Sequence, residues 1–270
     1  MSVVEEFKAS VSRSIQTIGE NKEFLDLSNT WLQKCIPLGY MHNFSWLGRP
    51  IIQIPQDSYA MQEMIWSVKP DLIIETGIAH GGSLVLSASM LALIDYCEAV
   101  EKGAVLDPKA SHRKVVGVDI DIRAHNREAI EAHPLSHKIE MYQGSSIAPE
   151  TIEHIKSIAA GYNTVMVFLD SNHTHDHVLS ELEFYAPLTS KGSYCAVWDT
   201  LVEDMPGDMY PERPWGPGDN PKTAVWEYMR RLKEEGRTAS DGEPLTFAYD
   251  HRLENKIALT VSRDGFLKRV

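Results

Sequence analysis

The densest group of chemically capable side chains lies between residues 169 and 177, where two aspartates and three histidines occur within nine residues. Asp170 follows one short apolar run, and Asp199 follows the next such run along the chain. If these runs are neighbouring parallel strands, both carboxylates reach the same edge of a sheet, where their hard oxygen atoms suit Mg²⁺. His173, three positions after Asp170, has the right residue type and spacing to act as a general base beside that metal.

The same segment permits other metal chemistry. His173 and His177 have the i, i+4 spacing of a helical zinc site, but Thr174 stands where the zinc motif needs a glutamate. His173 and His175 with a distal carboxylate would outline an iron facial triad. The alternative function is therefore a metal-dependent hydroxylase of a small natural product, or a hydrolase, built on His173, His175 and Asp176. His177 is expected to be a surface residue in the first turn of a helix.

A glycine-rich turn follows an earlier apolar run, with Glu75 before Gly77 and the pair Gly81–Gly82 after it. Gly77 permits a sharp turn, and the glycine pair lets a ligand approach the backbone at a helix N-terminus. The turn does not match the dinucleotide fingerprint, because Ala79 occupies the third position. A buried carboxylate at Glu75 would repel a phosphate but can receive the charged amino-acid end of S-adenosylmethionine, which is therefore the predicted cofactor.

Two further strand ends extend this site. Asp119 ends the next apolar run, where a carboxylate can accept hydrogen bonds from both ribose hydroxyls, and the segment 143–146 after the third run is placed to border a base. In the simpler interpretation, the glycines only end a strand and pack a helix. The predicted cofactor contacts are Glu75, Gly77, Ala79, Ser83, Asp119, Asp121, Ser145, Ser146 and Asp170.

A long loop rich in proline and glycine follows Asp199, over residues 203–221. A loop of this length after a catalytic strand is more often functional than idle. Trp215 is predicted to stack on a sugar ring, with Asp219 and Asn220 binding its hydroxyls. A packed surface loop is the simpler alternative.

These residues must be positioned by strands and helices that alternate along the chain. Apolar runs predict buried parallel strands, and an amphipathic segment follows each one. The predicted strands cover 71–76, 114–119, 138–142, 164–170 and 193–199, with two more at 246–249 and 257–261. This alternation indicates an α/β fold with a doubly wound sheet. Residues 1–45 are predicted to form a helical extension, and residues 46–270 the main domain.

Composition excludes several classes of function. Lys and Arg number 26 against 38 Asp and Glu, which gives a net charge of −12 over 270 residues. Such a chain is a poor general binder of nucleic acid or of anionic membrane surfaces. The three cysteines lie far apart, which indicates the cytoplasm. No apolar run reaches about 18 residues, so no membrane span is predicted.

From about Trp46 to Val270 the sequence resembles the cephalosporin hydroxylase/rhamnosyl O-methyltransferase family. The stretches that carry the resemblance are SWLG at 45–48, PDLIIETGIAHGGS at 70–83, GVDID at 117–121, LDSNH at 169–173, VWDT at 197–200, WGPGDNP at 215–221 and GFLKRV at 265–270. The resemblance implies a class I S-adenosylmethionine-dependent methyltransferase with a Rossmann-like sheet of seven strands, mostly parallel with one reversed. It also implies a divalent metal near the methyl donor and a homo-oligomer.

By position, the resemblance makes Glu75, Gly77 and Ser83 cofactor contacts, Asp119 the ribose ligand, Ser145 and Ser146 the adenine border, Asp170 and Asp199 metal ligands, and His173 the basic residue. Relatives often have two adjacent acids at the second metal position, whereas here Trp198 precedes Asp199 and Thr200 follows it. The third protein ligand is therefore open between Glu203, Asp204 and water. The hydroxylase activity is not carried over, since no iron or flavin site is evident.

Together, these observations predict a Mg²⁺-assisted O-methyltransferase acting on a small molecule or glycan. The expected acceptor is a sugar hydroxyl of a glycolipid, a surface polysaccharide or a natural-product glycoside. A third hypothesis is a partner subunit that keeps the cofactor fold without catalysis.

Overall fold

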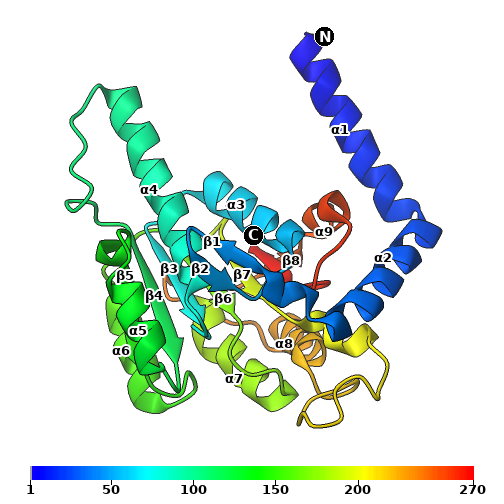
Figure 1. Ribbon diagram of the computed structural model, residues 1–270. Helices are drawn as coiled ribbons and strands as arrows, with labels where there is room; N and C mark the ends of the chain where they lie inside the picture. Colours follow the sequence, from blue (N-terminus) through cyan, green and yellow to red (C-terminus); the bar gives the residue numbers. More distant parts are fainter. Residues whose placement is uncertain (1) are drawn as a thin grey trace.

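The computed structural model describes residues 2–270 and contains a seven-stranded sheet in the order β5-β4-β3-β6-β7-β9-β8 (Figure 1). The strands are β3 (Leu72–Thr76), β4 (Lys114–Asp119), β5 (Ile139–Gln143), β6 (Val165–Leu169), β7 (Tyr194–Val197), β8 (Phe247–Tyr249) and β9 (Phe266–Arg269). Strands β3 to β7 are mutually parallel, whereas β9 runs antiparallel to both β7 and β8. The predicted fold, a mostly parallel sheet with one reversed strand, is confirmed.

Helices cover both faces of the sheet. The α-helices of the described residues are α1 (Val3–Glu20), α2 (Lys22–Cys35), α3 (Pro55–Val68), α4 (Gly82–Lys102), α5 (Ala124–Glu131), α6 (Pro149–Ala159), α7 (His175–Tyr185), α8 (Pro221–Glu235) and α9 (His251–Ile257), of which α3 to α8 flank the sheet. One hydrophobic cluster joins α3, α4 and α5 to the sheet, and a second joins α6, α7 and α8 to its opposite face.

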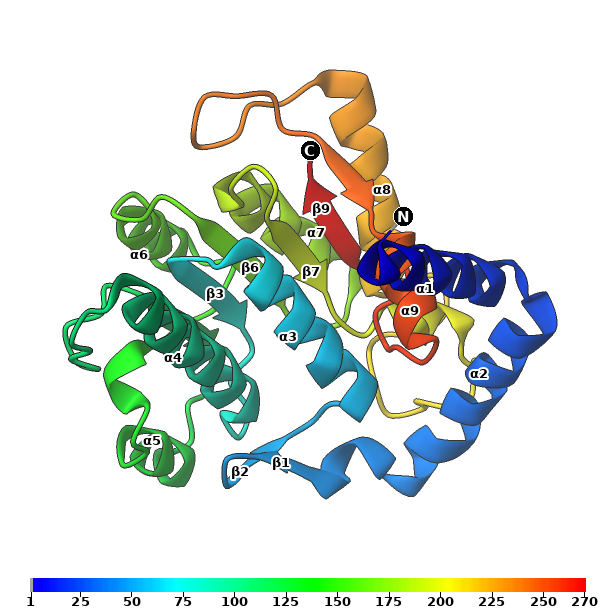
Figure 2. The same cartoon turned by 90° about the horizontal axis from the view of Figure 1, so that it is seen from above.

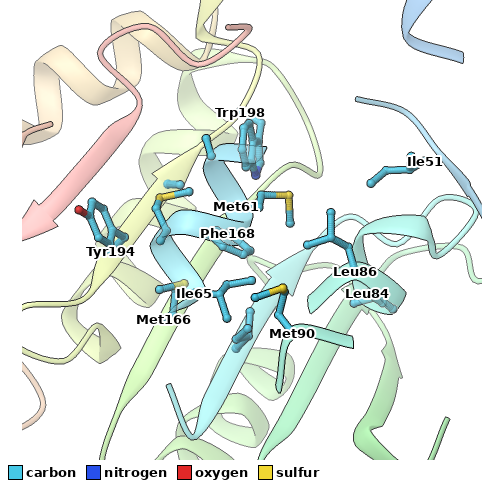
Figure 3. Packing of buried hydrophobic residues seen from close by; sticks show 14 of the residues in the cluster. Ile51, Met61, Ile65, Leu84, Leu86, Met90, Met166, Phe168, Tyr194 and Trp198 are labelled. Atoms are coloured by element: carbon cyan, nitrogen blue, oxygen red, sulfur yellow. The ribbon is translucent and has the colours of Figure 1, made fainter. Parts of the chain in front are cut away.

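The central strands are buried on both faces, which explains their unbroken apolar sequences. Successive side chains of β6 point to opposite sides, so Met166 and Phe168 belong to the first cluster while Val165, Val167 and Leu169 belong to the second. Figure 3 shows the first cluster, in which residues of α3 and α4 meet side chains of β6 and β7. This two-sided core fixes the carboxyl ends of β3, β6 and β7 relative to one another.

The strand predicted at 257–261 is wrong. The chain there ends α9 at Ile257, passes through Ala258 with a positive φ of 60°, and pairs its backbone with groups outside the sheet. The Val261 amide donates to the Asp57 carboxylate at 2.9 Å, and its carbonyl accepts from the Leu201 amide. The last strand is β9 instead, after a tight turn at Gly265, so the run 257–261 is a connecting segment of which Thr260 and Val261 are buried.

The N-terminal helices lie outside the sheet layers. Helices α1 and α2 form an arm at one side of the domain, and α1 crosses over α9 (Figure 2). Most of α1 is exposed, including Val3, Val4 and Phe7. A short hairpin of β1 (Phe44–Trp46) and β2 (Arg49–Ile51) then leads into α3. The domain boundary at residue 45 stays a prediction.

Helix α4 is long and apolar enough to cross a membrane by length and composition, with a mean hydropathy of 1.5 over its best 18-residue window. Half of that window is buried inside the domain. The buried part runs from Gly82 to Ile94 and packs on α3 and β4, as a core helix does. The remainder projects beyond the sheet and exposes Tyr96 and Val100 (Figure 1).

Candidate active site

The chemically capable residues meet at the carboxyl edge of the sheet, where β3 lies between β4 and β6. The strand order reverses here, because the chain runs from β3 outward to β4 and β5 and then crosses to β6 on the other side of β3. Open α/β sheets form a ligand crevice at such a point. Two cavities lie there, of about 230 Å³ and about 120 Å³, and both are bounded by Gly77 and Ser171. The larger reaches Ser83, His173 and Asp199, while the smaller reaches Asp119 and Ser146.

The turn after β3 is shaped by its glycines and by Asp119. Gly77 has a φ of 88°, and a Cβ atom there would overlap the backbone carbonyl of Asp170. Ala79 also has a positive φ, of 45°. One oxygen of the Asp119 carboxylate accepts from the Ile78 amide at 2.8 Å and from the Ala79 amide at 3.2 Å. Asp119 therefore holds the turn in place in addition to lining the smaller cavity.

Glu75 is buried beneath this turn, with 3% of its surface exposed. Burial raises the pKa of its carboxyl from 4.5 to about 7, against the opposing effect of hydrogen bonds from Ser87 and Ser83. Because these partners are neutral hydroxyls, the ionised carboxylate has no cationic partner of its own. A positively charged ligand group in the adjoining cavity would stabilise it.

Asp170, His173 and Asp199 come together as predicted. Each offers one atom to a group whose members all lie within 4.8 Å of one another, which is compact enough to hold a metal ion. His173 Nε2 lies 3.2 Å from Asp199 Oδ2. Burial raises the pKa of Asp170 well above its ordinary range, and the negative charges of Asp199 and Glu75 raise it further. A divalent cation at this point would reverse that effect.

Asp199 reaches the site from a strained turn. It is a non-glycine residue with a φ of 56°, in the left-handed region, at the start of the short helix η5 (Thr200–Asp204). Trp198 points the other way, is only 2% exposed, and packs against Phe168 and Phe266 in the core (Figure 3). Trp198 therefore anchors the strand end while the turn directs Asp199 toward Asp170.

Neither acid considered as a third ligand is available. The Glu203 carboxylate accepts from the Gly218 amide and from the side-chain amide of Asn220, and Asp204 pairs with Lys222 at 2.6 Å. Of the third ligands considered above, water is the one left open, and His173 is the remaining ionisable side chain beside the two aspartates. The iron triad considered above is not assembled, because the His175 ring bonds to Thr223 Oγ1 at 2.8 Å instead.

The loop after Asp199 lies beside this cluster. The Trp215 ring meets the His173 ring edge-on at 4.8 Å, and the Arg213 guanidinium lies 5.1 Å from the centre of the Trp215 ring. Asp219 accepts from the backbone amide of His175 at 2.7 Å. Asn220 is fully buried and caps α8, so both side chains are committed to fixing the loop. Contacts from Trp215, Asp219 and Asn220 to an acceptor stay a prediction.

The remaining predicted residues divide between cavity and surface. Ser83 and Ala79 line the larger cavity, and Ser145 and Ser146 line the smaller one. The Asp121 side chain is 72% exposed and faces Arg123.

The expectation that His177 is a surface residue is wrong, because its side chain is 19% exposed and lines a cavity. Its Nε2 lies 3.0 Å from Ser146 Oγ in the wall of the smaller cavity. The i, i+4 spacing of His177 and Glu181 was the one available signal that both share a face of α7.

Comparison with known proteins gives a consistent family. The sequence profile of the family described as rhamnosyl O-methyltransferase/CmcI matches residues 38–270. A rhamnosyl O-methyltransferase from Mycobacterium tuberculosis is 28% identical over 214 residues, which are 79% of this chain and 73% of the relative. The Mycobacterium leprae rhamnosyl O-methyltransferase is 26% identical over 226 residues, or 83% of this chain and 82% of the relative.

Solved structures of CmcI share the fold. One described with Mg and SAM is 18% identical and superposes with a TM-score of 0.53, covering 85% of this chain and 77% of that chain. An apo structure of CmcI gives a TM-score of 0.52 over the same shares.

The Gly77 turn yields a stability prediction. Gly77→Ala should lower the free energy of unfolding by about 3 kcal/mol, because the new methyl group is forced against the Asp170 carbonyl in a left-handed conformation. Gly103→Ala is the matched control, since Gly103 has a φ of 61° with open space around it. That variant should cost only about 1 kcal/mol. Equal losses in urea denaturation would contradict the proposed close contact.

The buried carboxyls yield a pH prediction. Burial raises the pKa of Glu75 from 4.5 to about 7, and that of Asp57 from 3.8 to about 7. Between these values the folded chain holds protons that the unfolded chain has released, so stability falls as pH rises through the window. With EDTA present, the melting temperature of Glu75→Gln should therefore decline less than that of the wild type between pH 5 and 7.5. Parallel declines would show that Glu75 contributes nothing to the effect.

Proposed function

This chain belongs to the rhamnosyl O-methyltransferase/CmcI family, and we propose that it is an S-adenosylmethionine-dependent, divalent-metal-assisted O-methyltransferase that modifies a sugar hydroxyl. The observation that carries the proposal is the convergence of Asp170, His173 and Asp199 beside the glycine turn. The family relatives are named for rhamnosyl methylation, and the CmcI structure is described with Mg and SAM.

The two adjoining cavities match the parts of the cofactor. Its ammonium and sulfonium groups are cationic. Asp170 lines the larger cavity, and the buried Glu75 carboxyl lies behind Ser83, which also lines it. Asp119 ends β4 at the smaller cavity and receives the ribose, with Ser145 and Ser146 beyond it at the base. The glycine turn at Gly77 lies between them, where the ligand must pass close to the backbone.

The residues present also fit a divalent metal. Across residues 2–270, no lysine or arginine forms an ion pair with Asp170 or Asp199, and His173 is the sole ionisable partner of Asp199. Two carboxylates with room for water suit Mg²⁺ or a similar cation. When bound, such an ion supplies Lewis-acid polarisation of the acceptor hydroxyl.

The side chains account for the transfer step. The acceptor oxygen forms a bond to the methyl carbon of the cofactor as the carbon–sulfur bond breaks, which converts the sulfonium to a thioether. The hydroxyl proton moves to His173 Nε2, which faces Asp199 within the same cluster. Asp170 and the glycine turn hold the two reactants in line, and positioning of this kind provides much of the acceleration.

The aromatic ring beside His173 favours a sugar as the acceptor. Trp215 presents an apolar aromatic surface next to His173, and aromatic rings commonly pack on the C–H face of a sugar. Rhamnosides are the first acceptors to test, whether they belong to a glycolipid, a surface polysaccharide or a natural product.

We further propose a homo-oligomer that works in the cytoplasm. Apolar side chains are exposed on α1, at Val4 and Phe7, and on the projecting end of α4, at Tyr96 and Val100. Exposed apolar groups of this kind mark contacts between subunits. All three cysteines are free, which supports a reducing compartment.

Loss of Asp170 provides the main test of the metal role. Asp170→Asn should lower turnover on a rhamnoside by a factor of about 10³ or more, because one of the two proposed metal ligands is lost. Affinity for S-adenosylhomocysteine should fall by a smaller factor, because the substitution removes one negative charge and leaves the rest of the cofactor site in place. Asp176→Asn is the matched control, because Asp176 is exposed in the same segment. Transfer of a radiolabelled methyl group measures the turnover of both variants. Full activity of the wild type in excess EDTA would count directly against the metal.

Substitution of His173 separates a base from a ligand. His173→Gln should lower kcat by roughly 10² to 10⁴, because the proton acceptor is lost. Binding of Mn²⁺, followed by electron paramagnetic resonance, should weaken by less than about tenfold if the aspartates provide the main attraction. Abolished Mn²⁺ binding would instead make His173 a metal ligand. Undiminished turnover would leave the chain without its proposed base, as expected for a non-catalytic subunit.

A further inference from the structure

His177 lies in a polar network that forms one wall of the smaller cavity. Its Nε2 is 3.0 Å from Ser146 Oγ and 3.1 Å from Ser171 Oγ. All three residues line the cavity, and Ser146 is 5% exposed. His177 is therefore part of the site that the proposed function assigns to the nucleoside of the cofactor.

Glu181 sets the direction of the hydrogen bonds in this network. Its side chain is fully buried, one turn of α7 beyond His177, and its Oε1 accepts from Ser171 Oγ at 2.7 Å. A carboxylate can only accept hydrogen bonds, so the single Ser171 hydrogen is used here. The Ser171 oxygen can then only accept from its other two neighbours, Ser146 Oγ at 3.5 Å and His177 Nε2 at 3.1 Å, and the shorter contact places the ring proton of His177 on Nε2.

This arrangement leaves one acceptor and one donor for a ligand. A neutral imidazole with its proton on Nε2 has a bare Nδ1, and Nδ1 has no partner within residues 2–270. Ser146 cannot donate to a nitrogen that already carries a proton, and its contact with Ser171 Oγ is long at 3.5 Å, so its hydroxyl hydrogen can turn to a ligand in the cavity. The backbone carbonyl of Ser146 is held by the Tyr185 hydroxyl at 2.6 Å, which fixes this part of the wall.

We propose that His177 and Ser146 recognise the adenine ring of the cofactor, with Ser171 and Glu181 as positioning residues that fix the tautomer of His177. This inference rests on the proposed function. Adenine offers an amino group that donates and a ring nitrogen beside it that accepts. The bare Nδ1 of His177 complements the amino group, and the Ser146 hydroxyl complements the ring nitrogen. Hypoxanthine carries a carbonyl in place of the amino group and would leave His177 unpaired.

Base discrimination therefore tests the proposal better than affinity alone. Calorimetric titration would compare S-adenosylhomocysteine with S-inosylhomocysteine on the full chain. The wild type should prefer the adenosyl compound by about tenfold or more, as expected when one hydrogen bond is replaced by an unpaired acceptor. His177→Phe should reduce the preference to about twofold, mainly by weakening binding of the adenosyl compound.

Matched variants keep the result interpretable. His154→Phe is the control, because His154 stacks on the Tyr142 ring and does not line either cavity. It should keep the wild-type preference. Ser146→Ala removes the donor with little change in volume and should also reduce the preference, so it carries the test if His177→Phe does not fold.

The outcomes distinguish failure of the adenine contact from failure of the proposed function. Weakening of both compounds by the same factor in His177→Phe would make the network structural and overturn the proposal. A wild type that binds both compounds equally would overturn it as well. A wild type that binds neither compound would instead remove the cofactor from the proposed function, and the role of His177 with it.

Discussion

The structure depends on a group of like charges held together at the carboxyl edge of one sheet. Asp170 lies at its centre, and the carboxylates of Asp199, Glu75, Glu181 and Asp57 all raise its pKa. Buried carboxylates without cationic partners are costly unless something neutralises them. The described chain places no lysine or arginine in contact with Asp170 or Asp199, so their charge is neutralised either by protons, as the raised pKa of Asp170 implies, or by bound cations. A divalent metal and the positively charged cofactor together meet that need, which joins the electrostatics of the site to the reaction proposed for it.

The fold supplies the restraint that keeps these charges close. Parallel pairing puts Thr76 opposite Leu169, and Leu169 opposite Val197, so β3, β6 and β7 end at one level. The absence of a side chain at Gly77 lets the first strand end approach the Asp170 backbone. Trp198 is buried in the core on the far side of Asp199 and anchors the strand end from which Asp199 projects.

Much of this arrangement is predictable from the sequence because parallel strands buried on both faces have a strong signature. The five apolar runs and the polar residues that end them indicate the sheet edge and bring Asp170 near Asp199. The tail is less predictable, because the backbone of Val261 pairs with the Asp57 carboxylate and the Leu201 amide rather than with a neighbouring strand. The same limit applies to Asn220 and His177, whose partners lie 17 and 31 residues away, at Glu203 and Ser146. Spacing along the chain cannot reveal contacts that depend on how loops fold back.

The central claim, that Asp170 and Asp199 share one cation, is tested most directly by anomalous diffraction from crystals of the wild type grown with Mn²⁺ and S-adenosylhomocysteine. We expect a single strong anomalous peak within coordination distance of both carboxylates, in the larger cavity beside Gly77. A peak bound elsewhere, or a site that holds the nucleoside with the two aspartates turned apart and no ion between them, would contradict it.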